Sequence, residues 1–225
     1  MKPLLPAITL IILVTNTCVA QSDSVITISD SVVNLSGSAV LKKHYPIKSC
    51  RIVFRFFNGP QSGTKTVIFD DWGNREKEEA VTMTDTAAMR NNLAGAPPAL
   101  RQMEIPAVQH NLLITVDGQR YAIDIDHHTG AKSPNLLIGG SMEAEMKQMG
   151  FAFVRTDTLL GKPCKVWEHP NAFRLWIWKD FYAIKKQMIA GLPGGMRIEE
   201  YPTEIDEAYS IKPDEFKIPD HIHFQ

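Results

Sequence analysis

Two pairs of histidines are the side chains in this sequence best suited to bind a metal ion or to move a proton: His127 with His128, and His221 with His223. Adjacent residues of a strand point to opposite faces, so His127 and His128 would not converge on one ion. His221 and His223 share a face near Asp220, but a catalytic zinc site needs about three protein ligands and an open coordination position. We therefore expect no metal site.

Carboxylates and hydroxyls form no recognisable catalytic set either. Asp124 and Asp126 stand at alternate positions, as on the solvent-facing side of a hairpin strand. No serine lies in a Gly-x-Ser-x-Gly turn. The sequence also has no P-loop, no Rossmann glycine set and no Cys-x-x-Cys motif. We expect a protein that is not an enzyme and has no cofactor.

The charge balance argues against nucleic acid as a partner. The 225 residues carry 24 basic and 25 acidic side chains, a net charge of -1, whereas domains that bind nucleic acid usually carry a clustered basic excess. Hydrophobic residues make up 44% of the chain and charged residues 22%, which is ordinary for a soluble globular protein. Composition sets neither the oligomeric state nor the partners.

The N-terminus has the pattern of an export signal. A charged start, Met1-Lys2-Pro3, is followed by the uncharged apolar run Leu4 to Val14, which is too short to span a bilayer comfortably. Cys18-Val19-Ala20 places small residues at the two positions that signal peptidase reads. We predict cleavage after Ala20, so that residues 1–20 are a signal peptide and residues 21–225 form a single domain, soluble in the bacterial periplasm.

Two rival interpretations of this segment are a buried N-terminal element and a lipoprotein signal. The second arises because Cys18 follows the apolar run. The preceding Thr15-Asn16-Thr17, however, lacks the Leu and the small residues of a lipobox. We therefore expect no lipid on Cys18.

Cys50 and Cys164 remain after signal cleavage, and in an oxidising compartment two such thiols are a candidate disulfide. The alternative is that each is a small buried hydrophobic residue, and spacing alone does not decide whether their Cα atoms are close enough to bond. Cys50 alternates in register with Ile52 and Phe54, and Cys164 with Val166. This register predicts that both cysteines lie on buried strand faces.

The rest of the chain is typical of a mainly β protein with one or two short helices. The best local signal is Asp117-Gly118, which suits a tight two-residue hairpin. We expect about nine to eleven strands in an antiparallel meander, which must close, form a sandwich or be covered. The clearest strands are Cys50 to Phe57, Thr66 to Asp70, Arg75 to Met83, Asn111 to Val116, Gln119 to Asp126, Phe151 to Thr158, Cys164 to His169, Phe173 to Lys179, Ala183 to Ile189 and Met196 to Tyr201.

Helical patterns are short. Ala87 to Asn92 and Ser141 to Met149 are the two candidates, the second capped by Ser141 and ended by Gly150. Along this second helix Met142, Met146 and Met149 share one face. The stretch from Ala94 to Pro106 contains several Pro and Gly residues and is predicted to be a loop.

The second half resembles a known family. Gly161-Lys162-Pro163-Cys164-Lys165-Val166-Trp167-Glu168 precedes Leu175-Trp176-Ile177-Trp178-Lys179-Asp180, and Pro213 to Asp220 includes Phe216-Lys217-Ile218-Pro219. This order resembles the outer-membrane lipoprotein carrier (LolA/LolB-like) superfamily, in an exported bacterial branch. The resemblance implies an open, curved antiparallel sheet, a half-barrel, with helices on its concave side. It also implies a cavity that holds an acyl chain or another apolar ligand.

Flexible and aromatic side chains agree with such a cavity, because Met adapts to ligands of varied shape and Trp can line a pocket or its rim. The candidate cavity residues are Met142, Met146, Met149, Trp167, Trp176 and Trp178. We therefore expect a periplasmic carrier-like protein whose partner is a lipid or hydrophobic small molecule, with peripheral association with the envelope. The alternative is a structural or interaction module of the cell envelope, whose sheet is filled by its own side chains and binds no ligand.

Overall fold

The computed structural model describes residues 43–135, 142–170, 172–189 and 197–224. All of them belong to the compact unit Leu41–Gln225. The signal peptide predicted over residues 1–20 lies outside the described residues, as does Ser141, the predicted helix cap.

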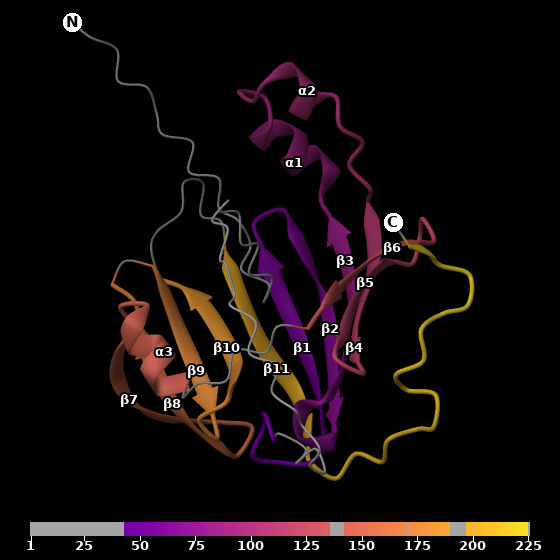
Figure 1. The fold of residues 1–225 in the computed structure, drawn as a ribbon. Helices are drawn as coiled ribbons and strands as arrows, with labels where there is room; N and C mark the ends of the chain where they lie inside the picture. The colour runs from indigo at the N-terminus through magenta and orange to yellow at the C-terminus, as the bar shows by residue number, and fades with distance from the viewer. Residues whose placement is uncertain (1–42, 136–141, 171, 190–196, 225) are drawn as a thin grey trace, which may run out of the picture. The chain divides into compact units, whose positions relative to one another are not determined.

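One 12-stranded sheet forms this unit, in the order β12-β6-β5-β4-β3-β2-β1-β11-β10-β9-β8-β7 (Figure 1). The sheet is open and curved, and the fold class is mainly β with short helices, as the sequence predicted. The strands are β1 Cys50–Asn58, β2 Gln61–Asp70, β3 Arg75–Thr84, β4 Val108–Val116, β5 Gln119–Asp124, β6 Thr129–Pro134, β7 Ala152–Leu159, β8 Lys162–Glu168, β9 Phe173–Trp178, β10 Tyr182–Met188, β11 Ile198–Asp206 and β12 His223–Phe224.

The connectivity is not a simple meander. Strand β1 pairs on one side with β2 and on the other with β11, both antiparallel. The chain therefore runs from β1 to β6 towards one edge, crosses to the opposite edge at β7, and returns through β8, β9 and β10 to β11. Only Lys186 and Gln187 of β10 pair with β11, at Glu200 and Glu199.

Local chemistry explains several of these elements. Asp117 and Gly118, at φ values of 51° and 69°, form the tight turn between β4 and β5 that the sequence predicted. Gly150, at φ 82°, follows α3 Met142–Gln148 and ends it. Its N–H donates to the carbonyl of Lys147, and that of Phe151 to the carbonyl of Met146, which satisfies the last helical carbonyls.

Three elements of the fold were not predicted from the sequence. Strand β6 was not predicted, and the loop expected between Ala94 and Pro106 contains the helical turn α2 Pro98–Arg101. The two-residue strand β12 was also unforeseen, because its pairing with β6 is parallel and joins segments far apart in the chain.

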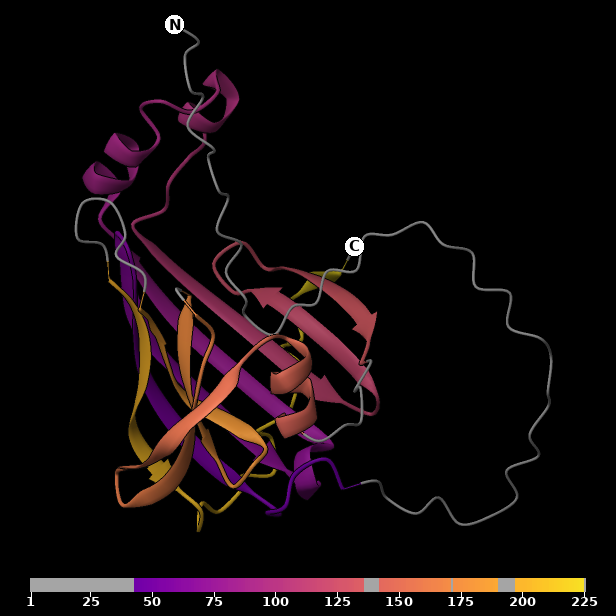
Figure 2. The same cartoon turned by 90° about the vertical axis from the view of Figure 1, so that its left-hand side faces the viewer.

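The helices differ in their relation to the sheet. Helix α3 lies against β8 and β9 (Figure 2). Its Met146 forms a buried cluster with Trp167 of β8 and Ile177 of β9. Helix α1 Thr86–Asn92 begins after Asp85, whose side chain accepts a hydrogen bond from the N–H of Ala88 at 2.9 Å. Neither α1 nor α2 has a buried residue, and both lie beyond the ends of β3 and β4 (Figure 1). Of these helices, α3 is the one that covers the sheet.

Three apolar clusters hold the sheet together. The largest gathers side chains of β1 and β2 with those of β8, β9 and β10, among them Cys50, Phe54, Phe69, Trp176 and Trp178. A second lies on the other face of β2, where Ile68 packs with β4, β5 and the C-terminal segment that contains Phe216 and Ile218. The third is the cluster under α3, on the face of β8 and β9 opposite to Val166 and Trp178.

Candidate functional site

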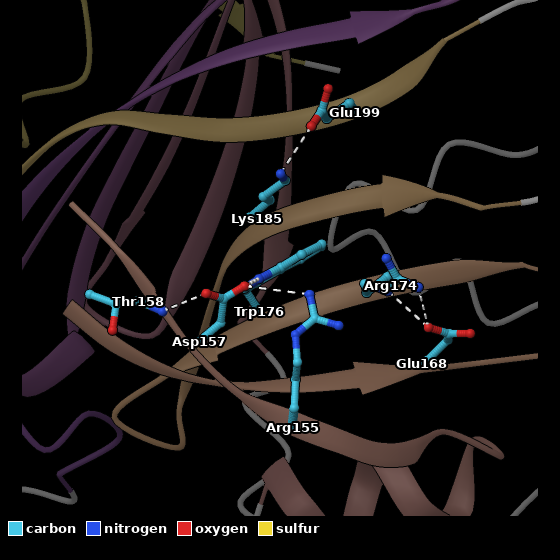
Figure 3. Close-up of polar contacts among 8 residues, drawn as sticks. All are labelled: Arg155, Asp157, Thr158, Glu168, Arg174, Trp176, Lys185 and Glu199. Atoms are coloured by element: carbon cyan, nitrogen blue, oxygen red, sulfur yellow. Dashed lines mark hydrogen bonds and ion pairs between the residues drawn. The ribbon is translucent and has the colours of Figure 1, made fainter. Parts of the chain in front are cut away.

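Trp176 is the centre of a polar network that spans β7 to β11 (Figure 3). Its indole Nε1 donates to Oδ2 of Asp157 at 3.0 Å, and the backbone N–H of Thr158 donates to Oδ1 of the same carboxylate at 2.8 Å. Arg155 lies 3.6 Å from Oδ2 of Asp157. The hydrogen bond from Trp176, followed by that from Thr158, lowers the pKa of Asp157 below its ordinary value.

A basic side chain lies over the same indole ring. Nζ of Lys185 lies 4.6 Å from the ring centroid of Trp176 and 3.2 Å from Oε1 of Glu199. Glu199 also accepts from Nε of Arg197 at 2.7 Å. Burial alone would raise the pKa of Glu199, but the hydrogen bonds from Arg197 and Lys185 outweigh it and the pKa is lowered.

This Trp176 network, formed by Arg155, Asp157, Thr158, Trp176, Lys185 and Glu199, matches each carboxylate with a basic side chain. In the neighbouring pair, Nε and Nη2 of Arg174 both donate to Oε2 of Glu168, at 2.8 and 2.6 Å (Figure 3). The hydrogen bond to Asp157 and the contact with Lys185 hold the indole in place. A surface pocket of about 290 Å³ beside it is lined by Leu159, Leu160, Lys185, Arg197, Glu199, Tyr201 and Pro202.

A second hollow, which we call the α3–β7 groove, has a volume of about 340 Å³. Its lining residues are Glu143, Lys147, Phe151, Ala152, Phe153, Lys165 and Trp167. The rings of Phe153 and Trp167 meet edge to face at 5.8 Å, and 51% of Phe153 is exposed. Aromatic surface therefore borders a groove whose other lining residues include charged side chains from α3 and β8.

The charged residues of the groove form solvent-exposed ion pairs. Nζ of Lys147 lies 2.8 Å from Glu143, and Nζ of Lys165 lies 2.9 Å from Asp180 and 3.8 Å from Glu143. The hydrogen bond to Asp180 raises the pKa of Lys165, so this amine is charged at neutral pH. Exposed ion pairs of this kind contribute little stability in water, so either lysine is free to turn towards an anionic group.

The six candidate cavity residues from the sequence lie in different places. Trp176 and Trp178 are buried in the largest cluster, while Trp167 and Met146 are buried in the cluster between α3 and the sheet. Met142 is half-buried against the same cluster, and Met149 is 52% exposed. Of the six, Trp167 lines the α3–β7 groove, and the others line neither pocket described above.

Both cysteines are buried, as the strand register predicted, and both are free thiols. They belong to the same apolar cluster. Burial raises the pKa of Cys50 to about 12 and that of Cys164 to about 11. The thiolate, the reactive form, is therefore scarce at neutral pH.

Native protein is accordingly expected to react slowly with a thiol reagent at Cys50 and Cys164 until it unfolds. Mass spectrometry after a timed pulse of iodoacetamide, with and without urea, measures this directly. Rapid modification of either cysteine in the absence of urea would contradict the buried strand faces assigned here.

Histidines and aspartates organise the β5–β6 turn. Asp124 lies 2.8 Å from Nδ1 of His127, and Asp126 accepts from the N–H of His110 at 2.8 Å. The hydrogen bond to Asp124 raises the pKa of His127. The ring of His221 lies 4.7 Å from that of His128, edge to face. Within the described ranges no group of three or more His, Cys, Asp or Glu side chains is placed to hold a metal ion.

A buried charged cluster was missed by the sequence analysis. Lys65 of β2 is only 9% exposed, and its Nζ lies 2.7 Å from Glu200 and 3.8 Å from Glu78. Lys186 lies 3.6 Å from Glu200. Beside this Lys65 cluster (Lys65, Glu78, Lys186 and Glu200), the hydroxyl of Tyr45 donates to Glu76 at 2.6 Å.

Lys65 and Glu200 stay ionised although their surroundings are largely closed to solvent. Burial lowers the pKa of Lys65, but the charges of Glu200 and Glu78 together raise it by more than burial lowers it. The net shift of the pKa is therefore upward. Burial raises the pKa of Glu200, but Lys186 and Lys65 lower it, and the net shift is downward. The signal that could have revealed this cluster is the alternation Lys65, Val67, Phe69, which places a lysine on a strand face that is otherwise apolar.

In the part of the chain that the structure describes, no helix is long and apolar enough to cross a membrane.

The known proteins that resemble this chain do so only distantly. No family model and no curated protein matches this chain. Among solved structures, an uncharacterized conserved protein from Thermus thermophilus has a TM-score of 0.48 at 10% identity, over 80% of this chain and 91% of that one. A LolA superfamily protein from Nitrosomonas europaea has a TM-score of 0.29 at 9% identity, over 80% of this chain and 94% of that one. Similarities this distant assign no function.

Proposed function

We propose that this chain is an exported, non-enzymatic protein of the bacterial periplasm that binds the apolar part of a lipid or similar amphipathic molecule in the α3–β7 groove. The observation that carries the proposal is the groove itself, an open hollow of about 340 Å³ whose lining includes Phe151, Phe153 and Trp167. Pockets for small ligands span roughly 300–1,000 Å³ and are lined mainly by apolar and aromatic groups.

Charge at the groove favours a ligand with an anionic head. Lys147 and Lys165 are among its lining residues, and their present partners Glu143 and Asp180 are at least two-fifths exposed. Such pairs are easily exchanged for a ligand carboxylate or phosphate, because they gain little from each other in water. An acyl chain against the aromatic rings and an anionic head beside the lysines is the ligand class that this groove fits best.

Replacing Phe153 with Glu is expected to weaken binding of a fluorescent fatty-acid analogue at least tenfold while the urea midpoint changes little. The substitution removes a ring from the groove and places a negative charge beside the expected head group. Because 51% of Phe153 is already exposed, the new carboxylate remains solvated.

Val154→Glu is the matched control, since Val154 is the next residue, is 46% exposed and does not line the groove. It should bind like the wild type. Equal loss of binding in both variants would place the ligand elsewhere. A wild-type protein that binds no apolar probe, and from which organic solvent extracts no lipid detectable by mass spectrometry, would refute the proposal.

The burial of Met146, Trp176 and Trp178 favours a second candidate, a structural or interaction module of the cell envelope that holds no ligand. These side chains fill the sheet's clusters themselves, which is what such a module requires. The extraction experiment separates the two candidates, because lipid that co-purifies stoichiometrically excludes the second.

A further inference from the structure

Strand β7 is one edge of the sheet. Among the described residues it pairs only with β8, so one row of its backbone N–H and C=O groups faces outward. It is mostly exposed, with Phe153 and Val154 at 51% and 46%. Such an edge is a template for another strand unless charged side chains, Pro or a bulge protect it. There is no Pro within β7, the bulge between Phe153 and Arg155 leaves the segment from Arg155 onward regular, and the charges in that segment, on Arg155 and Asp157, are of opposite sign.

We propose that β7 pairs antiparallel with β7 of a second copy of this chain, about a twofold axis that passes through Thr156. Directly opposed residues of an antiparallel pair point to the same face of the sheet, whereas neighbouring residues of one strand point to opposite faces. A twofold axis between two identical strands therefore places one residue opposite its own copy. The axis can therefore pass through Arg155, Thr156 or Asp157 in the regular part of the strand, and these three choices differ in charge.

Charge complementarity selects the axis. With the axis at Arg155 two guanidinium groups are opposed, and with the axis at Asp157 two carboxylates are opposed; both arrangements are unfavourable. With the axis at Thr156, Arg155 of each copy faces Asp157 of the other, and the two threonines face each other. The side chains of Arg155 and Asp157 are 49% and 37% exposed, so both are accessible to a second copy.

The expected dimer is weak. One short strand pair buries less surface than the roughly 1,200–2,000 Å² of a standard stable interface. We expect a monomer–dimer equilibrium with a dissociation constant on the order of 10–100 µM, measured by sedimentation velocity across a concentration series. A chain that remains monomeric at about ten times this concentration would overturn the proposal.

Charge exchange tests the register. Arg155→Asp and Asp157→Arg should each abolish self-association, because each opposes like charges at both pairs. An equimolar mixture of the two variants should regain the dimer, since each chain then meets its opposite charge twice. Circular dichroism must first show that both variants fold, because Asp157 also accepts the hydrogen bond from Trp176. Self-association of either folded variant at wild-type strength would exclude the register.

Cysteine crosslinking tests the axis without touching Asp157. In a Cys18→Ser background, Thr156→Cys should form an intermolecular disulfide under mild oxidation, since the two Cα atoms face each other. Thr158→Cys is the control: its two copies would be displaced by about four residues, or roughly 13 Å, beyond the approximately 7 Å that a disulfide spans. The buried Cys50 and Cys164 should not interfere. Crosslinking of Thr158→Cys equal to or above that of Thr156→Cys would refute the axis.

Discussion

Lys65→Met is expected to lower the free energy of unfolding by about 3 kcal/mol, because it leaves two largely buried carboxylates without their lysine. Nζ of Lys65 lies 2.7 Å from Glu200 and 3.8 Å from Glu78, and the lysine is only 9% exposed. Methionine replaces the aliphatic stem but not the charge. Glu200 keeps Lys186, at 3.6 Å, which moderates the loss. Urea unfolding at neutral pH measures the change.

Two further variants identify the cause of that loss. Adding Glu200→Gln to Lys65→Met should recover part of the stability, since a stranded charge costs more than a missing pair. Lys147→Met is the control at the surface, because Lys147 is 64% exposed and pairs with Glu143. This variant should lower the free energy of unfolding by less than about 0.5 kcal/mol. If Lys65→Met costs no more than Lys147→Met, the buried cluster contributes nothing and this explanation fails.

Met146→Glu is the second substitution with a large expected effect, a loss of about 3 kcal/mol or more, which could abolish folding. Met146 is 5% exposed and packs against Trp167 and Ile177 beneath α3. A carboxylate in that position would be buried without a partner. Circular dichroism and urea unfolding measure the effect.

Met149→Glu provides the same change of side chain in an exposed position. Met149 follows α3 and is 52% exposed, so its variant should remain within about 0.5 kcal/mol of the wild type. A folded Met146→Glu protein that loses only probe binding would show that Met146 lines a cleft rather than a core. It would also extend the binding site of the α3–β7 groove beneath the helix.

The elements that the sequence predicted well are those that local chemistry controls. The alternation of Cys50, Ile52 and Phe54 specified a strand with one buried face, and all three side chains are buried. Asp117-Gly118 specified a tight turn, and Gly150 specified the end of α3. Each of these depends on the backbone preferences of a few neighbouring residues, which act wherever the segment lies in the fold.

Short or unusual elements were harder to predict. Strand β6 has no apolar alternation, because its residues from Thr129 to Pro134 are mostly small or polar and largely exposed. It exists because β5 offers a free edge for pairing. The α3–β7 groove has the same origin: Phe151 and Phe153 follow Gly150 in sequence, but Lys165 and Trp167 reach them only through the pairing of β7 with β8.

The sequence by itself thus determined that this chain builds a mainly β domain from short strands, with Cys50 and Cys164 on buried faces. Tertiary structure alone decided that β1 lies between β2 and β11, which brings Glu200 to Lys65, and that α3 buries Met146 but leaves Met149 in solvent. The physical reason is the separation in sequence between the residues that interact. Turn geometry and side-chain alternation are properties of adjacent residues, whereas burial and ion pairing depend on which distant strand comes to lie beside them.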